Sequence, residues 1–388
     1  MIRVAILGST GSIGRATLSV VQRHTDRFSV VALGAHRSIG DLAAQVAEHQ
    51  VPRAVIADPE GLSDRESLPS ADWRAGPDEL LELVTDPDVD VVVNAIVGSV
   101  GLEATLAALR AGKRLALANK ESLVAGGSLV MEAARQGGGE LIPIDSEHSA
   151  ILQCLAGNDL SSVDRLVLTA SGGPLRGLSH DELQTVSPTQ ALRHPTWDMG
   201  AKITIDSATL ANKALEVIEA HFLYDVGYDR IDVVVHPQSI VHSMVEFKDG
   251  SVLAQMGFPT MELPILYALS YPQRVSDAAL RTFDAIRSSP LTFEKVDLER
   301  FPLFALGVEA GVRGGTVPAV YNAANEVAVD AFLSEEVGFL EMAAVVAHAM
   351  ENVPRRNVDV VNDVLEADVA ARCAAREFVS SPRSMSSG

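Results

Sequence analysis

The chain has 388 residues, 47% of them hydrophobic and 21% charged, which excludes a disordered polymer and leaves room for two or three globular domains. The formal net charge of -20 argues against nucleic acid and anionic membrane surfaces as partners, so an anion site would need a local cluster of basic side chains. The two cysteines argue against a disulfide framework and favour the cytoplasm. A strand at the very N-terminus argues against a signal peptide. The lack of an apolar run of ~20 residues argues against a membrane span.

The first residues have the pattern of a dinucleotide-binding fold. Residues 2–7 predict a buried strand, the glycine-rich GSTGSIG follows, and residues 15–24 predict a helix. Gly8 would permit the tight turn, Gly11 would let the backbone approach a pyrophosphate, and the helix N-terminus would attract the anion. The glycines could also form a plain turn, since their spacing differs from the commoner GxGxxG.

The second strand ends in a sequence that favours NADP(H). After the strand at residues 28–33 the chain reads GAHRS, without the Asp or Glu that an NAD site would place near the ribose hydroxyls. Arg37 could instead bind a 2′-phosphate bidentately. The alternative is an ordinary surface arginine.

Predicted strands and helices alternate up to residue 144. Residues 58–77 read as a polar loop, strands are expected at 53–57, 89–96, 114–118 and 140–144, and helices at 78–84, 101–112 and 121–136. Such alternation predicts a doubly wound parallel sheet, in which ligands bind beyond the carboxyl ends of the strands. One crevice could therefore hold the residues that follow the strands: residues 8–14, Arg37, residues 95–98, Asn119, Lys120 and residues 145–147.

Two carboxylates, Asp145 and Glu147, follow the last of these strands. Two residues apart on extended backbone, they can point the same way and offer hard oxygen ligands for Mg²⁺ or Mn²⁺. Such a site needs a further acidic ligand, and Glu216 is the candidate. His148 could join, although a histidine at a helix start is more often structural. The simpler interpretation is that both carboxylates cap the helix that follows.

Residues 194–216, HPTWDMGAKITIDSATLANKALE, combine several candidate functions. The segment KITI is strand-like, and Ser207 is placed to cap a following helix. One face of that helix is polar and carries Thr209, Asn212, Lys213 and Glu216. This face could be solvated, or it could present an amide, an ammonium and a carboxylate to a ligand. The basic side chains that an anion needs gather here: Arg193, His194, Lys202 and Lys213.

The rest of the chain predicts a second sheet followed by helices. Strands are expected at 166–171, 231–238, 240–247 and 251–256, with the last two paired as a hairpin about Asp249-Gly250. This sheet is apolar on both faces, which suggests packing against more protein, such as a second subunit. A short helix within 260–272, a linker at 276–300, helices over 301–376 and a disordered tail at 380–388 complete the chain. The polar side chains of the YNAANE segment, Asn322, Asn325 and Glu326, could be buried networks or caps.

Taken together, the motifs resemble those of the 1-deoxy-D-xylulose 5-phosphate reductoisomerase family over nearly the whole chain. They occur in this order: GSTGSIG (8–14), ALANKESLV (116–124), PIDSEHSA (143–150), SGGP (171–174), HPTWDMG (194–200), IDSATLANKALEVIEA (205–220), HPQSIVHSMVEF (236–247) and YNAANEVAV (321–329). Two positions depart from the family pattern. His36 stands where many members have glycine, and Thr196 replaces a frequent asparagine.

The resemblance implies a fold and an activity. The fold would be α/β, with an N-terminal Rossmann-like doubly wound parallel sheet, a central α/β catalytic domain with a mixed sheet, and a C-terminal helical bundle. The domains would be residues 1–150 for NADPH, 151–275 for catalysis, 276–300 as a linker and 301–388 as the helical domain with its tail. A homodimer would convert 1-deoxy-D-xylulose 5-phosphate to 2-C-methyl-D-erythritol 4-phosphate with NADPH and Mn²⁺ or Mg²⁺, Co²⁺ being a further candidate.

The resemblance also implies roles for particular residues. The metal ligands would be Asp145, Glu147 and Glu216. The substrate phosphate would contact Ser171, Ser207, Asn212 and Lys213. The sugar would contact Lys120, Ser146, Glu147, Glu216 and His194, under a lid that carries Trp197 and Met199. Lys120, Glu147 and His194 would be catalytic. NADPH would contact Thr10, Gly11, Ser12, Ile13, Arg37, Ser38, Asn119, Glu121 and Gly200.

Two other functions fit parts of the sequence. Another NADP-dependent dehydrogenase, acting on a semialdehyde or sugar phosphate, would share the N-terminal half but would not need three metal carboxylates. A nucleotide-sensing protein could use the same fold without catalysis.

Overall fold

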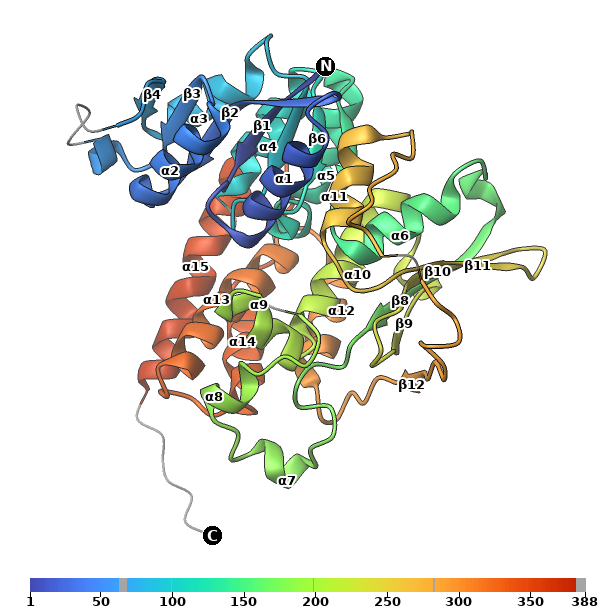
Figure 1. Cartoon of the computed structure of the whole chain (residues 1–388). Coiled ribbons are helices and arrows are strands. Elements are labelled where there is room, and N and C mark those ends of the chain that lie inside the picture. Colours follow the sequence, from blue (N-terminus) through green and yellow to red (C-terminus); the bar gives the residue numbers. More distant parts are fainter. Residues whose placement is uncertain (63–67, 99, 198, 282, 382–388) are drawn as a thin grey trace. The chain divides into compact units, whose positions relative to one another are not determined.

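The computed structural model describes residues 1–62, 68–98, 100–197, 199–281 and 283–381 (Figure 1). The chain forms two compact units, which are described separately. Unit 1 comprises residues 1–123, 127–158 and 254–284, and unit 2 comprises 124–126, 159–253 and 285–388. Most of the predicted disordered tail, residues 382–388, lies outside the described residues. Among those described, no helix has the length and apolar character needed to cross a membrane.

Unit 1 is built on a seven-stranded parallel sheet, and the sequence predicts six of its strands. Its strands lie in the order β4 (Asp72–Ala75), β3 (Arg53–Ile56), β2 (Phe28–Ala35), β1 (Ile2–Leu7), β5 (Val91–Asn94), β6 (Arg114–Leu117) and β7 (Glu140–Pro143). The order reverses between β1 and β5, and ligands of such sheets bind at that switch point.

Helices cover both faces of this sheet, because the central strands are buried on both sides. They are α1 (Ser12–Arg23), α2 (Ile39–His49), α3 (Pro77–Thr85), α4 (Gly101–Arg110), α5 (Lys120–Gly137), α6 (Ser146–Leu155) and α11 (Glu262–Ser270). Val4 and Ile6 of β1 pack in one core with side chains of α1, α2 and α11. Ala5 and Leu7 point to the other face, where α3 contacts β1 and α4 contacts β5 and β6.

The predicted loop at residues 58–77 is wrong in part. It contains a 3-10 turn, η1 (Pro59–Leu62), and the edge strand β4, while residues 63–67 lie outside the described part. The strand was missed because its sequence, DWRA, has a single large apolar side chain. That side chain, Trp73, is buried in the core and donates its indole N–H to the Pro69 carbonyl at 2.9 Å.

Unit 2 contains the predicted mixed sheet. Its order is β11 (Val252–Met256), β10 (Val241–Phe247), β8 (Val163–Ala170), β9 (Ile231–Val235) and β12 (Glu294–Lys295). The β8–β9 pair is parallel, whereas β10 and β12 run antiparallel to their partners. The predicted hairpin between β10 and β11 is confirmed, and the strand β12 lies within the segment predicted as a linker.

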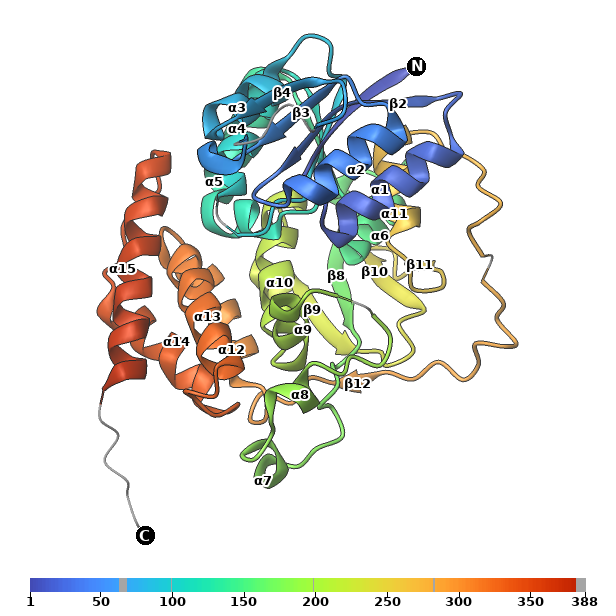
Figure 2. The ribbon, with the colours of Figure 1, turned by 60° about the vertical axis from the view of Figure 1, so that its left-hand side comes forward.

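Helices make up the rest of unit 2. Those that precede the bundle are η3 (Leu160–Ser162), α7 (His180–Leu183), α8 (Pro188–Ala191), α9 (Ala201–Ala208), α10 (Ala211–Tyr224) and η4 (Tyr228–Arg230). The bundle itself is α12 (Pro302–Arg313), α13 (Val317–Leu333), α14 (Glu341–Asn352) and α15 (Val361–Ser380), which pack side by side (Figure 2). It confirms the predicted C-terminal helices, and α12 also packs on α10.

The segment before α10 differs from the prediction. KITI is not a strand but part of the helix α9, where Ile205 and Ala208 are buried three residues apart. Ser207 therefore lies inside a helix and does not cap α10. The chain turns instead at Leu210, whose φ of +59° is in the left-handed region, and α10 begins at the next residue.

Candidate functional site

The glycine turn after β1 has the geometry that a nucleotide phosphate requires. Gly8 has φ +74°, and a Cβ there would lie 2.4 Å from the Ala95 carbonyl oxygen at the end of β5. A Cβ on Gly14 would lie 2.4 Å from the Gly8 oxygen, so the helix packs against the turn as closely as its backbone allows. The predicted cofactor residues, Thr10, Gly11, Ser12 and Ile13, lie at least partly exposed at the start of α1. Anions bind at such helix starts.

Arg37 follows β2 and has 75% of its side chain exposed. Its Nε donates to Asp58 Oδ2 at 3.0 Å, so it is not an isolated surface side chain. The Glu60 backbone N–H and, to a lesser degree, Arg37 hold the pKa of Asp58 below its usual value. The adjacent Ser38 precedes α2 and is exposed. Asp58 thus holds the predicted 2′-phosphate ligand in place while most of its surface stays accessible.

A buried polar network joins the ends of β5 and β6. Asn94 Nδ2 donates to the Gly101 carbonyl at 3.0 Å and to Thr105 Oγ1 at 2.9 Å. Asn119, the N-cap of α5, donates to the Ile96 and Gly98 carbonyls at 2.8 and 2.9 Å.

Glu121, one of the predicted cofactor contacts, belongs to the same network. The Asn119 amide also donates to its carboxylate at 2.9 Å, and both side chains are buried. The network therefore uses Asn119 and Glu121 to fix the loop that follows β5.

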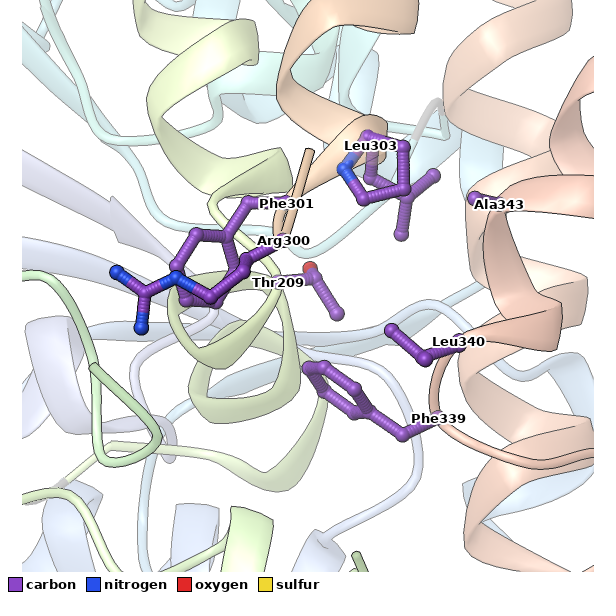
Figure 3. Close-up of a pocket in the computed structure, with 8 residues that line it drawn as sticks. Thr209, Arg300, Phe301, Leu303, Phe339, Leu340 and Ala343 are labelled. Carbon is purple, nitrogen blue, oxygen red and sulfur yellow. The ribbon is translucent and has the colours of Figure 1, made fainter. Parts of the chain in front are cut away.

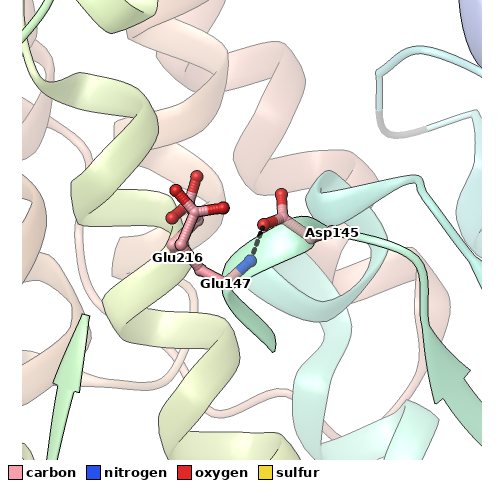
Figure 4. Close-up of side chains that lie close together, drawn as sticks. All are labelled: Asp145, Glu147 and Glu216. Carbon is pink, nitrogen blue, oxygen red and sulfur yellow. Dashed lines mark hydrogen bonds between the residues drawn. The ribbon is translucent and has the colours of Figure 1, made fainter. Parts of the chain in front are cut away.

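Lys120, Asp145 and Glu147 come together at the ends of β6 and β7. Lys120 Nζ lies 2.7 Å from Asp145 Oδ2, and the Glu147 N–H donates to Asp145 Oδ1 at 3.3 Å (Figure 4). Ser146 Oγ donates to the Glu147 carboxylate. Asp145 is thus the N-cap of α6, as the simpler interpretation holds, and its second oxygen faces an ammonium. The cluster joins a cation to two hard oxygen ligands at the ligand-binding edge of the sheet.

In unit 2, the SGGP turn after β8 holds Ser171 against His194. Ser171 Oγ lies 3.0 Å from His194 Nε2. His194 Nδ1 accepts the backbone N–H groups of Thr196 and Trp197 at 3.1 and 2.9 Å, so the ring proton is on Nε2, which donates to the serine. Burial lowers the pKa of His194 below its usual value, which favours this neutral form. Asp198, within the predicted lid 194–200, lies outside the described residues.

The same turn lies on the C-terminal end of α9. Gly173 has φ +67°, and a Cβ there would lie 2.5 Å from the Ser207 carbonyl oxygen. Ser171 and Ser207, two predicted phosphate ligands, therefore come from segments that touch. Gly200, a predicted cofactor contact, is the exposed N-cap of α9 in unit 2.

The polar face of α10 is not solvated. Lys213 and Glu216 are buried, and Asn212 is half-buried. Lys213 Nζ and Asn212 Nδ2 both donate to the Glu216 carboxylate, which is 1% exposed. Burying a carboxylate is costly unless cations or donors compensate its charge. The three side chains thus form one compensated group, which excludes the interpretation of a solvated face.

Thr209, which is not among the residues with an implied ligand role, has a structural role. Its hydroxyl donates to the Ile205 and Asp206 carbonyls and accepts the Ala211 N–H at 3.3 Å. It also lines a small, mostly apolar pocket with Arg300, Phe301, Pro302, Leu303, Phe339, Leu340 and Ala343 (Figure 3). None of the predicted ligand residues lines that pocket.

Comparisons with known proteins place the chain in a family. The model of 1-deoxy-D-xylulose 5-phosphate reductoisomerase matches residues 4–127, and models of C-terminal domains of that enzyme match 141–224 and 256–374. A 1-deoxy-D-xylulose 5-phosphate reductoisomerase of Cupriavidus pinatubonensis is 50% identical over 384 residues, which cover 97% of both chains. One of Heliobacterium modesticaldum is also 50% identical and covers 99% of both chains. The chain belongs to the 1-deoxy-D-xylulose 5-phosphate reductoisomerase family.

Solved structures of 1-deoxy-D-xylulose 5-phosphate reductoisomerases share the fold. The Zymomonas mobilis enzyme in complex with NADPH has a TM-score of 0.92 and 43% identity, with coverage of 98% of this chain and 100% of that one. A reductoisomerase in complex with NADPH, fosmidomycin and magnesium has a TM-score of 0.91 and 38% identity, with 98% of both chains covered.

Several polar residues of this reductoisomerase fold were missed or left unassigned by the sequence analysis. Asn94 and Asp58 follow or flank strand ends but match no motif by themselves. Asp206 lies inside a motif, directly after KITI, for which the sequence predicts a strand. Asn325 was singled out without a role, and its Nδ2 donates to Asp206 Oδ1 at 2.7 Å. The signal in the sequence for that pair was an asparagine within an alanine-rich predicted helix.

Proposed function

We propose that this chain catalyses the NADPH- and divalent-metal-dependent conversion of 1-deoxy-D-xylulose 5-phosphate to 2-C-methyl-D-erythritol 4-phosphate, a step of non-mevalonate isoprenoid precursor biosynthesis. A ketose phosphate rearranges to a branched aldehyde, which is then reduced. The observation that carries the proposal is the cluster of Lys120, Asp145 and Glu147 at the ends of β6 and β7. A plain dehydrogenase does not need such carboxylates at the edge of its nucleotide sheet.

Asp145, Glu147 and Glu216 are assigned as the metal ligands, a set of three carboxylates of the kind that could hold one ion. Hard oxygen donors suit Mg²⁺ or Mn²⁺, with Co²⁺ as a further candidate. The chemistry of the donor set supports the fit, because Asp145 pairs with an ammonium and Glu216 is buried among hydrogen-bond donors. When bound, the ion would polarise the ketone and lower the pKa of a neighbouring substrate hydroxyl.

The substrate phosphate is assigned to Ser171, Ser207, Asn212 and Lys213. The hydroxyls come from two touching segments, and the ammonium and amide come from α10. The phosphate takes no part in the bond changes, so holding it serves to position the reacting carbons.

The sugar is assigned to Lys120, Ser146 and His194, with Trp197 on the covering segment. Lys120 can donate to a developing alkoxide. His194, with its proton on Nε2, can donate to a substrate oxygen in place of Ser171. A covering indole would keep water away from the reactive aldehyde.

NADPH would supply the hydride, and the chain would bind and orient it. Thr10 to Ile13 would receive the pyrophosphate at the start of α1, and Arg37 with Ser38 the 2′-phosphate. Asn119, Glu121 and Gly200 are assigned to the nicotinamide side. The asparagine and the glutamate would act mainly by shaping the loop after β5, because their polar groups bond within the protein.

The functional division is proposed as residues 1–150 for NADPH, 151–275 for catalysis, 276–300 as a linker and 301–388 as the helical domain. The active form is proposed to be a homodimer in the cytoplasm.

The test is NADPH oxidation by the purified chain with 1-deoxy-D-xylulose 5-phosphate and Mn²⁺, with and without a chelator. Turnover should depend on the metal and return when Mn²⁺ is added back. Turnover that survives complete metal removal would favour the dehydrogenase alternative, and NADPH binding without any turnover would favour the nucleotide sensor.

Glu216→Gln sharpens this test, because it keeps the shape of a proposed ligand and removes its charge. Turnover should fall by at least about 100-fold, with NADPH affinity largely kept. Glu219→Gln is the matched control, since Glu219 is also buried on α10 but has no assigned ligand role. Equal losses in both variants would contradict the assignment of Glu216.

A further inference from the structure

The C-terminal bundle reaches α9 through a buried hydrogen bond. Asn325 of α13 is fully buried, and its Nδ2 donates to Asp206 Oδ1 at 2.7 Å. A carboxylate can only accept, so the orientation of the Asn325 amide is fixed by this contact. The other Asp206 oxygen lies 2.9 Å from Lys202 Nζ, and Asp206 is 1% exposed. Both oxygens of this buried carboxylate therefore have a partner, and one of the two partners comes from the bundle.

Asp206 immediately precedes Ser207 at the end of α9. The Thr209 hydroxyl donates to the Asp206 carbonyl and accepts the Ala211 N–H, which joins this end to the first turn of α10. The left-handed Leu210 makes the corner sharp. A shift of Asp206 would therefore move Ser207 and the start of α10 together.

A second contact shows how closely the bundle supports α10. A Cβ on Gly307 of α12 would lie 2.5 Å from Ala214 Cβ of α10 and 2.7 Å from the Tyr321 ring of α13. The backbone of α12 is therefore inserted between these two helices. Tyr321 donates its hydroxyl to the Leu303 carbonyl at 2.9 Å, which ties α13 to α12.

We propose that Asn325 is a positioning residue for the substrate phosphate, acting through Asp206 on Ser207 and the start of α10. The inference rests on the proposed function, because it uses the phosphate ligands assigned there. The Asn325 Oδ1 has no hydrogen-bond partner among the described residues, so the bond to Asp206 is what its amide contributes. The bundle then has a role in substrate binding as well as in support.

Asn325→Asp tests this directly, since it keeps the shape and sets a second carboxylate against Asp206. The probe is inorganic phosphate, measured as a competitive inhibitor and by direct binding. Phosphate affinity should fall by about 10-fold or more, as expected for loss of a hydrogen bond to a charged group, and KM for the sugar phosphate should rise in parallel. NADPH affinity, whose assigned contacts lie in unit 1 except for Gly200, should change by less than about 2-fold.

Asn322→Asp is the matched control. Asn322 is also buried on α13, one turn away, but it donates to Glu326 and not to Asp206. Its phosphate affinity should stay within about 2-fold of the wild type. If both asparagine variants lose phosphate and NADPH affinity equally, Asn325 serves general stability and the proposal is overturned.

The reciprocal variant Asp206→Asn with Asn325→Asp restores an amide–carboxylate pair and should bind phosphate better than either single variant. If Asn325→Asp does not fold, the same measurements are made on Asn325→Ser, for which the same loss of phosphate affinity is expected. Wild-type phosphate affinity in a folded Asn325 variant overturns the proposal. Because phosphate binding needs no turnover, this outcome is distinct from a wild-type chain that fails to convert the sugar phosphate.

Discussion

At the scale of single residues, ionic and hydrogen-bond partners decide how each assigned ligand is presented. Arg37 is held by Asp58, and His194 is held by two backbone N–H groups. Lys213 and Asn212 converge on Glu216. These neighbours set the orientation or protonation state in which a ligand would find each side chain.

Arg37→Ala should weaken NADPH binding by about 10-fold or more and leave NADH binding nearly unchanged. A charge-assisted bond to the 2′-phosphate is worth about 1.5–3 kcal/mol, and NADH lacks that group. Fluorescence titration with both coenzymes measures the effect. Asp58→Asn, which removes the holding carboxylate but keeps the arginine, should cause a smaller loss. An equal loss of both coenzymes in Arg37→Ala would refute the assignment.

His194 should make the stability of unit 2 depend on pH. Its pKa is lower in the folded chain than the ordinary ~6.5, so folding favours the neutral ring. The neutral ring contributes fully to the free energy of unfolding above pH ~6.5. This contribution is lost as the pH falls toward the pKa of His194 in the folded chain, because the unfolded chain then binds more protons than the folded chain. Protonation also removes the Nδ1 acceptor used by Thr196 and Trp197.

Urea unfolding of the wild type and His194→Gln measures this effect at pH 8 and pH 5.5. The wild type should exceed the variant in free energy of unfolding at pH 8, and the gap should narrow at pH 5.5. A difference in free energy of unfolding that is larger at pH 5.5 than at pH 8 would contradict a neutral His194 ring in the folded chain.

At the scale of elements, strands with continuous apolar sequences and helices with clear periodicity were predicted correctly. The parallel sheet, the β10–β11 hairpin and the four C-terminal helices all follow from such patterns. Short elements were the failures. KITI alternates like a strand over four residues, but this length cannot distinguish a strand from a buried helix turn. The edge strand β4 is mostly polar and gave no periodic signal.

Only those residues of the candidate site that lie within a recognisable sequence motif could be predicted. Asp145, Glu147 and Lys120 follow strand ends, so the topology of the sheet brings them together. The contacts of Asp206 with Asn325 and of Gly173 with Ser207 join segments far apart in the sequence, and no local pattern encodes them.

Gly173→Ala should disturb the corner between the SGGP turn and α9. The added Cβ would lie 2.5 Å from the Ser207 oxygen at a φ of +67°, so the turn must shift, at a cost of about 1–3 kcal/mol. The free energy of unfolding should fall, and KM for the sugar phosphate should rise. Gly177→Ala is the control, because a Cβ there meets nothing within 4 Å. Equal behaviour of the two variants would show that the turn does not position Ser207.

At the scale of the whole molecule, the mixed sheet of unit 2 leaves an edge that favours association. Val252 and Leu253 of the edge strand β11 are 50% and 43% exposed, and an unpaired apolar edge strand is an association site. The sequence predicts a second subunit from the apolar faces of this sheet, and that expectation stays a prediction.

Light scattering should therefore give a particle of twice the chain mass of 41.1 kDa. Val252→Lys should shift the equilibrium toward the monomer, whereas Leu160→Lys, at an equally exposed position outside the sheet, should not. A wild-type monomer at micromolar concentration would contradict the proposed homodimer.

The discontinuous course of unit 1 has a consequence for biosynthesis. Ile265 and Leu269 of α11 belong to the core that covers one face of the nucleotide sheet, yet they are made more than 120 residues after β7 ends at Pro143. N-terminal domains generally fold first as they leave the ribosome. Here part of one apolar face of the nascent sheet stays uncovered until α11 has left the ribosome and can dock beside α1 and α2.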